Sequence, residues 1–212
     1  MTSQAKKTGL IIPIAITFIV LLLDQASKFW VKTNMYLNQE IPVFGDWAII
    51  HFTENPGMAF GMEFGGEFGK LFLSLFRIVA VSALGYYVYH LVKNKAPRGI
   101  IIAITLIFAG AIGNIIDSVF YGIIFSDSYY QIAEFMPANG GYGSWLHGRV
   151  VDMIYLPVIK GVVPDWSPVM AGDYFIFFRP IFNLADTAIS VGVGLILILY
   201  RQFWGEEKKQ KA

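Results

Sequence analysis

Residues 100–121 read IIIAITLIFAGAIGNIIDSVFY, and this stretch constrains the fold more than any other part of the chain. It is long enough to cross the hydrocarbon core of a bilayer as an α-helix, which takes about 20 residues. It shows no period-2 alternation, so a helix is favoured over a strand. Asn114 and Asp117 lie in its last turns. Because an ionisable group inside a membrane is costly, Asp117 needs a structural or functional reason to be there.

Three further runs, residues 10–31, 71–92 and 185–204, are similarly long and apolar. Of the 212 residues, 56% are hydrophobic and 15% are charged, whereas a soluble domain carries roughly a quarter charged residues. We therefore expect an α-helical integral membrane protein with four transmembrane helices, forming one membrane-embedded domain over residues 1–212. The first run is too long for a signal peptide and no small-residue cleavage site follows it, so we expect it to be retained.

The distribution of Lys and Arg predicts the orientation. Nine of the 16 basic residues fall before the first span, between the second and third, or at and beyond the end of the fourth: Lys6, Lys7, Lys93, Lys95, Arg98, Arg201, Lys208, Lys209 and Lys211. By the positive-inside rule both termini are cytoplasmic, and the loops 32–70 and 122–181 are extracytoplasmic. The first loop contains a predicted short strand at residues 47–52, so we expect a small β-sheet there. The second loop is long and rich in aromatic residues, which suits the bilayer interface.

Composition also excludes several function classes. The net charge is +1, so no basic field indicates a nucleic-acid partner. Cys is absent, which excludes a thiol nucleophile and Cys-ligated metal sites. His51, His90 and His147 are scattered and show no HExxH-like spacing.

The predicted topology brings five polar islands to one face of the membrane. They are residues 24–28 (DQASK), 55–60 (NPGMAF), 113–117 (GNIID), 148–152 (GRVVD) and 182–186 (FNLAD). Four of them have a purely structural alternative, whereas a lone carboxylate such as Asp152 in an apolar run is hard to justify structurally. Residues 55–57 (NPG) are an ordinary turn signal. Asp24 and Lys28 are four residues apart and can form a local ion pair, Asn114 and Asp117 can join two helices, and Asn183 can cap the fourth helix.

Asp152 and Asp186 allow a sharper hypothesis. Two carboxylates held close together share a proton. The ionised member can then take a proton from water while the neutral member donates a hydrogen bond to a scissile carbonyl. Ser27 and Lys28 are adjacent on a helix, so they make a poor Ser–Lys dyad. A magnesium ion bound by Asp117, Asp152 and Asp186 is the alternative, although we expect neither a metal nor another cofactor.

Taken together, the five islands in this order resemble the lipoprotein signal peptidase family (signal peptidase II), over essentially the whole chain. The resemblance implies a multi-pass aspartyl endopeptidase of the bacterial cytoplasmic (inner) membrane with its active site at the extracytoplasmic face. Such an enzyme removes the signal peptide from diacylglyceryl-modified prolipoproteins, cutting just before the lipidated cysteine.

The resemblance also implies that Asp152 and Asp186 are the catalytic dyad. It also implies supporting or substrate-contacting roles for Asp24, Asn55, Gly57, Asn114, Asp117, Asn183 and Ala185, and we add Lys28 as the partner of Asp24. The implied partners are the lipidated substrate and membrane lipid, and we expect a monomer.

The chain departs from the family pattern in two ways. The family usually has Arg directly after the Asp of the third island, and here that residue is Ser118. We expect Arg77 or Arg149 to supply the missing positive charge near the site. The stretches on either side of Asp152 are also longer than the compact family pattern, although loops lengthen without moving their ends.

Two other classes of function stay open from sequence. Carboxylates within a membrane commonly mark ion or proton paths in transporters, but the polar residues of this chain cluster at one face and do not continue through the spans. A non-catalytic assembly factor could use the same carboxylates to bind a partner, and cleavage by the purified protein would separate it from a peptidase.

Overall fold

The computed structural model describes residues 3–56 and 66–210. The helices are α1 (Ser3–Asn34), α2 (Gly66–Lys93), α3 (Arg98–Ile116), a π-helical turn (Asp117–Tyr121), α4 (Gly122–Ile124) and α5 (Leu184–Gln210). Among the described residues three helical stretches are long and apolar enough to cross a membrane: Gly9–Asn34, Gly69–Lys93 and Arg98–Ile124. These three correspond to the first three predicted spans. The apolar part of α5, Leu184–Leu199, is shorter.

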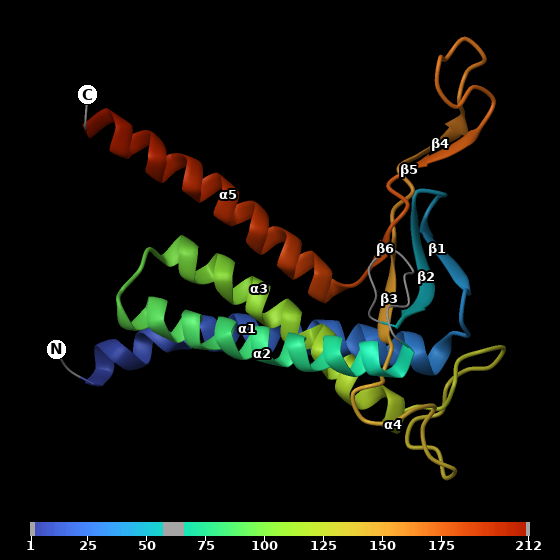
Figure 1. The fold of residues 1–212 in the computed structure, drawn as a ribbon, viewed down its shortest axis with the longest axis horizontal. Coiled ribbons are helices and arrows are strands. Elements are labelled where there is room, and N and C mark those ends of the chain that lie inside the picture. The colour runs from blue at the N-terminus through green and yellow to red at the C-terminus, as the bar shows by residue number, and fades with distance from the viewer. Residues whose placement is uncertain (1–2, 57–65, 211–212) are drawn as a thin grey trace.

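The long helices lie alongside one another, with α3 in contact with α1, α2 and α5. Figure 1 shows the ends of α1 and α5 that carry the termini on the side opposite the sheet, together with the α2–α3 connection. The contact between α3 and α5 is close because small residues face each other across it. A Cβ atom built on Gly110 would lie 2.2 Å from the carbonyl oxygen of Ala185, and one on Gly192 would lie 2.6 Å from that of Ala103. Such stretches of small residues let helix backbones approach within a membrane.

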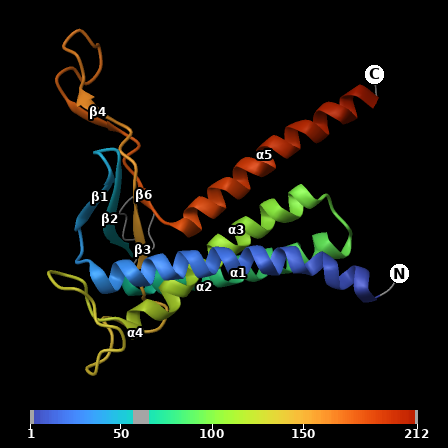
Figure 2. The same ribbon diagram turned by 180° about the vertical axis from the view of Figure 1, so that it is seen from behind.

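A small antiparallel sheet lies at one end of the helices, across their axes (Figures 1 and 2). Its strand order is β1-β2-β3-β6. The strands are β1 (Glu40–Phe44), β2 (Ala48–Asn55), β3 (Val150–Tyr155) and β6 (Ile181–Phe182). The predicted strand at residues 47–52 is thus confirmed as part of β2. A separate hairpin, β4 (Ile159–Val162) with β5 (Tyr174–Phe177), extends beyond the sheet.

The inner strand β3 connects the sheet to the helix ends. Its first four residues are buried, and Val151 and Met153 belong to a hydrophobic cluster with Phe52 of β2 and Val31 of α1. Thr53 pairs with Asp152, and Asn55 pairs with Val150. This packing fixes Asp152 at the junction between the sheet and the helices.

The third helix changes its winding where its polar residues begin. The regular α-helix ends at Ile116, and a π-helical turn follows from Asp117 to Tyr121. Single π-helical turns within α-helices are frequent at functional sites. The hydroxyl of Ser118 donates to the carbonyl oxygen of Asn114, 3.1 Å away.

Candidate active site

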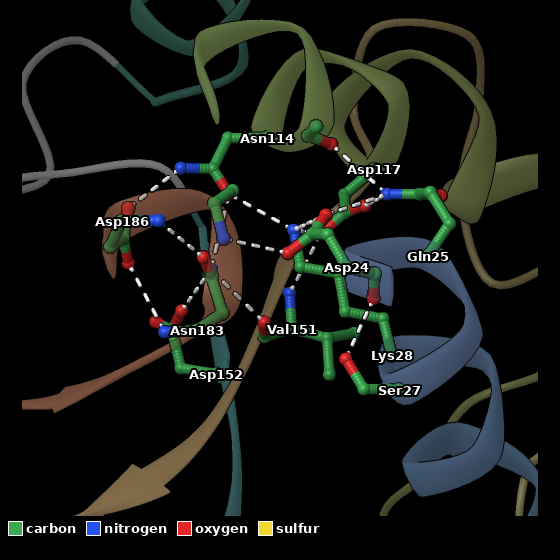
Figure 3. A network of polar contacts seen from close by, with 12 residues as sticks. Asp24, Gln25, Ser27, Lys28, Asn114, Asp117, Val151, Asp152, Asn183 and Asp186 are labelled. Carbon is green, nitrogen blue, oxygen red and sulfur yellow. Dashed lines mark hydrogen bonds and ion pairs between the residues drawn. The ribbon is translucent and has the colours of Figure 1, made fainter. Parts of the chain in front are cut away.

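Four separate elements bring their polar residues to one place at the sheet end of the helices (Figure 3). Helix α1 contributes one carboxylate, one amide and one ammonium group, α3 and its π-turn contribute an amide and a carboxylate, β3 contributes a carboxylate, and the start of α5 contributes an amide and a carboxylate. These residues are Asp24, Gln25, Lys28, Asn114, Asp117, Asp152, Asn183 and Asp186. Four of the five polar islands therefore converge through the residues drawn in Figure 3.

Two asparagines connect the carboxylates of Asp152 and Asp186. The side-chain amide of Asn183 donates to Oδ1 of Asp152, 2.7 Å away. The amide of Asn114 donates to Oδ1 of Asp186 at 2.8 Å, and the Asn183 amide lies 3.1 Å from Oδ1 of Asn114. Each carboxylate is thus oriented by a neutral amide and keeps its second oxygen for other partners.

Asn183 also caps α5, which begins at the next residue. Its Oδ1 accepts the backbone N–H of Asp186 at 2.8 Å, and Oδ2 of Asp186 accepts the backbone N–H of Asn183 at 3.4 Å. This reciprocal pair is a capping box, which satisfies two N–H groups that the helix leaves without partners. The predicted cap is confirmed, and it fixes the position of Asp186 in the first turn.

The carboxylate of Asp24 binds the same helix start from α1. Its Oδ1 accepts the backbone N–H of Ala185 at 2.9 Å. A negative group at a helix N-terminus interacts favourably with the helix dipole. Space here is tight, because a Cβ atom on Gly113 would lie 2.7 Å from Oδ2 of Asp24. Ala185 therefore belongs to the site through its backbone.

Lys28 is the positive centre of the buried network. Its Nζ lies 2.9 Å from Oδ2 of Asp24, 2.9 Å from Oδ2 of Asp117 and 3.0 Å from Oδ1 of Asn114. The side chains of all three charged residues are fully buried. The local pair with Asp24 that the sequence suggested is confirmed, and Lys28 extends it to α3. Ser27 instead donates its hydroxyl to the carbonyl oxygen of Asp24, so it does not form a dyad with Lys28.

Asp117 attaches strand β3 to the helices. Its Oδ2 accepts the backbone N–H of Val151 at 3.1 Å, and its Oδ1 accepts the amide of Gln25 at 2.9 Å. Both oxygens are therefore occupied by donors of this chain. Within residues 3–56 and 66–210, no three acidic or histidine side chains lie close enough to hold a metal ion. The arrangement of donors thus does not fit the magnesium site considered from the sequence.

A cavity of about 320 Å³ opens beside the two carboxylates. Asn55, Arg77, Asn114, Asp152 and Asp186 line its polar part. The rest of its wall is apolar and comes from α2, α3, α5 and the start of β3: Ala80, Val81, Leu84, Ala111, Ile115, Val150 and Ile189. A polar end that holds two carboxylates next to an apolar wall is typical of an enzyme site for an amphipathic ligand.

The environment of Asp152 favours its neutral form. Burial and, after it, the negative charge of Asp186 raise the pKa of this carboxyl to about 7, against the hydrogen bond from Asn183, which lowers it. Only 5% of Asp152 is exposed. A carboxyl that keeps its proton near neutral pH beside a second carboxyl can act as an acid.

Two arginines were candidates for the missing positive charge, and the structure places one of them at the cavity. Arg149 does not contact the two carboxylates, since its guanidinium binds Glu54 at 2.9 Å and Asp127 at 3.5 Å. Arg77, the other candidate for the missing positive charge, lines the cavity. Gly57 lies outside the described residues. Of the second island, the structure therefore describes the position of Asn55 in the cavity wall.

Three residues that were not singled out from the sequence form a second buried polar cluster. Glu54, Lys32 and Ser128 contact one another close to the site. Lys32 lies four residues after Lys28, and Glu54 directly precedes Asn55. Lys32 thus repeats the four-residue spacing of Asp24 and Lys28 along one face of α1, and this repeat could have indicated a second buried cation.

Comparisons with known proteins indicate the family of this chain. The model of the family described as signal peptidase (SPase) II matches residues 16–202. The lipoprotein signal peptidase of Porphyromonas gingivalis is 52% identical over 187 residues, which cover 88% of this chain and 81% of that protein. The enzyme of the same name from Amoebophilus asiaticus is 38% identical over 86% of this chain and 75% of its own length. A solved bacterial membrane enzyme, determined at 1.9 Å by the in meso method, is 27% identical, with a TM-score of 0.56 over 89% of this chain and 91% of its own.

Proposed function

Because this chain belongs to the signal peptidase II family, we propose that it is a membrane aspartic endopeptidase acting on diacylglyceryl-modified prolipoproteins. It removes their signal peptide by cutting just before the lipidated cysteine. The observation that carries the proposal is the pair of carboxylates, Asp152 and Asp186, oriented by two asparagines at the polar end of one cavity.

The two carboxylates take different roles in this mechanism. Asp186 lies in the first turn of α5, where the helix dipole and the N–H donors of Asn114 and Asn183 favour a negative charge. It takes a proton from the attacking water, whose oxygen bonds to the scissile carbonyl carbon. Asp152, neutral because it is buried, donates a hydrogen bond to the carbonyl oxygen as negative charge develops there. The proton held by Asp186 then passes to the leaving nitrogen as the C–N bond breaks.

The cavity supports a lipid-linked substrate. Its apolar wall comes from α2 and α3, both long and apolar enough to cross a membrane, and from the first turns of α5. A substrate that carries a diacylglyceryl group stays in the bilayer, so it reaches the dyad from within the membrane. The signal peptide and the acyl chains bind along the apolar wall, and the scissile bond lies at the polar end.

For the topology we propose the arrangement that the distribution of basic residues predicts. Helix α5 is the fourth span, both termini are cytoplasmic, and the sheet end with the dyad faces away from the cytoplasm. The family and the apolar helices indicate a protein of the bacterial inner membrane. Exposed aromatic side chains of the loop 122–181, such as Tyr130, Trp145, Trp166 and Phe177, lie at the membrane–water interface. The four helices form the site within one chain, as expected of a monomer.

The proposal is tested by the product of the reaction. Purified protein in detergent is given a prolipoprotein whose cysteine carries diacylglyceryl, and an identical chain without the lipid serves as control. We expect one new amino terminus, the lipidated cysteine, by mass spectrometry, and a much slower reaction of the unlipidated chain. Folded protein that cuts neither chain would indicate a binding or assembly role instead.

A further inference from the structure

A second buried charge cluster lies next to the dyad and takes no part in the mechanism above. Glu54, at the end of β2, pairs with Lys32 of α1 and, through its other oxygen, with Arg149 at 2.9 Å. Ser128 bonds both Lys32 (2.8 Å) and Glu54 (3.1 Å). The side chain of Lys32 is fully buried and that of Glu54 is 2% exposed. One buried cation, Lys32, and one partly exposed cation, Arg149, therefore share the buried carboxylate of Glu54.

Aromatic rings complete the enclosure of this cluster. Tyr142 lies beneath both cations, with its ring centroid 4.9 Å from Nζ of Lys32 and 4.8 Å from the guanidinium of Arg149. Its hydroxyl accepts the backbone N–H of Arg149 at 2.7 Å. Cations held over aromatic faces and away from water interact strongly with them. The backbone that leads into β3 is thus fixed at Arg149 from two directions.

The register of the sheet relates this cluster to the dyad. Glu54 pairs with Val151, and Asn55 pairs with Val150. Side chains alternate across a strand, so Glu54 points to the helix α1 side while Asn55 lines the cavity. Arg149 directly precedes β3 and lies three residues before Asp152. The carboxylate of Glu54 therefore joins α1 to β2 and to the start of β3. Asn55 and Val150, which line the cavity, belong to these two strands.

We infer that Glu54 is a positioning residue of the peptidase, which acts through Lys32 and Arg149 to hold β2 and β3 against α1 and thereby sets the position of Asp152 relative to Asp186. The inference rests on the proposed function for its kinetic readout. The backbone N–H of Val151, directly before Asp152, already binds β3 to Asp117. Glu54 supplies a second attachment through Arg149, so the start of β3 is held at two points. A displacement of about 1 Å at a catalytic group costs on the order of a hundredfold in rate.

A purely structural role for the cluster predicts a different experimental result from a positioning role, so an experiment can distinguish the two roles. Replacing a buried ion network with apolar residues of similar volume is often neutral or stabilising, whereas removing one member leaves a charge without its partner. Apolar contacts have no preferred direction. An apolar replacement of the whole cluster is therefore expected to restore thermal stability without restoring the attachment of β3 to α1.

The experiment compares three full-length variants with the wild type in detergent: Glu54→Gln, the triple variant Lys32→Met/Glu54→Leu/Arg149→Met, and Glu134→Gln as matched control. Glu134 is exposed on the loop before β3. The values of kcat and KM for a diacylglyceryl-modified prolipopeptide, and the Tm, are measured for each.

For Glu54→Gln we expect kcat to fall about 10- to 100-fold, with KM within about twofold of the wild-type value. For the triple variant we expect a Tm close to that of the wild type and the same low kcat. Glu134→Gln is expected to match the wild type in all three.

Two results would overturn the inference: wild-type kcat in Glu54→Gln, or recovery of kcat and Tm together in the triple variant. If the wild type itself does not cleave, the proposed function fails and the inference is judged on amide hydrogen exchange of residues 150–155. Positioning predicts faster exchange there in Glu54→Gln than in Glu134→Gln, and equal exchange in the two variants would reject it.

Discussion

The side-chain nitrogen of Asn183 lies 2.7 Å from a carboxylate oxygen of Asp152, while the oxygen of the same amide accepts the backbone N–H of Asp186 in the first turn of α5. One fully buried residue therefore fixes both the strand that carries one carboxylate and the helix that carries the other. Helix capping and orientation of the dyad are joined in a single side chain.

This double role can be separated by substitution. Asn183→Ala removes both functions, and we expect a loss of about 1 kcal/mol of stability from the cap and about a hundredfold lower kcat. Asn183→Ser keeps a good N-cap residue but is too short to reach Asp152. We expect it to recover most of the Tm and little of the kcat, measured by thermal unfolding and by cleavage of a lipidated prolipopeptide. Full activity of Asn183→Ser would show that its bond to Asp152 is dispensable.

The close contact of α3 with α5 gives a second prediction. In Gly110→Ala the new Cβ would lie 2.2 Å from the backbone oxygen of Ala185 and 2.8 Å from Ile189. Because α5 must move and carries Asp186, we expect a loss of about 1–3 kcal/mol of stability and reduced activity. In Gly194→Ala, on the apolar part of α5, the new Cβ would meet nothing within 4 Å, so this variant should be neutral or more stable by up to about 1 kcal/mol. Equal Tm values for the two variants would mean that the helices tolerate a wider separation.

The pH dependence follows from Asp152. Its pKa is raised from 3.8 to about 7 in the folded protein, chiefly by burial, so the reaction loses its acid as the pH rises through about 7. We expect kcat/KM to fall over that range, as an apparent property of the coupled pair. A rate that stays constant up to about pH 9 would contradict the acid role.

Stability should depend on pH for the same reason. Between about pH 4 and pH 7 the folded state holds the proton of Asp152 and the unfolded chain does not, so the free energy of unfolding falls as the pH rises. This amounts to at most about 4 kcal/mol. Asp152→Asn cannot titrate, and its Tm relative to the wild type should therefore rise between these two pH values. A constant difference in Tm would argue that Asp152 titrates normally.

Arg77 is the basic residue of the cavity wall, and we expect Arg77→Gln to lower kcat/KM about tenfold, because a positive charge near Asp152 and Asp186 stabilises the charge that develops during the reaction. The control is Arg98→Gln, on an exposed residue at the other end of the helices. The idea that Arg77 or Arg149 replaces the Arg that the family usually has at position 118 is wrong if Arg77→Gln and Arg149→Gln both keep full activity.

The sequence predicted the parts of the site that depend on local spacing. The ion pair of Asp24 with Lys28 and the cap formed by Asn183 are both confirmed, because each needs only residues three or four positions apart on a helix. The small sheet and the apolar helices were predicted from periodicity, and the structure contains both.

The parts that depend on distant contacts could not be predicted. Glu54 and Lys32 are separated by 22 residues, and Glu54 and Arg149 by 95. Arg149 was expected near the carboxylates because it belongs to the island that contains Asp152. In the structure its side chain instead points to Glu54, since the register of β2 with β3 decides which neighbours meet. That register is set by tertiary packing, which a single sequence does not reveal.

The most direct test of the account is cleavage of a diacylglyceryl-modified prolipoprotein by the purified protein in the presence of EDTA, with Asp152→Asn and Asp186→Asn beside the wild type. Both variants keep the shape of the side chain and remove its ability to ionise. We expect the wild type to cleave with EDTA present and each variant to lose at least about a hundredfold in kcat while staying folded. Full activity in either variant would contradict the assignment of the dyad, and loss of wild-type activity in EDTA would contradict metal-independent catalysis.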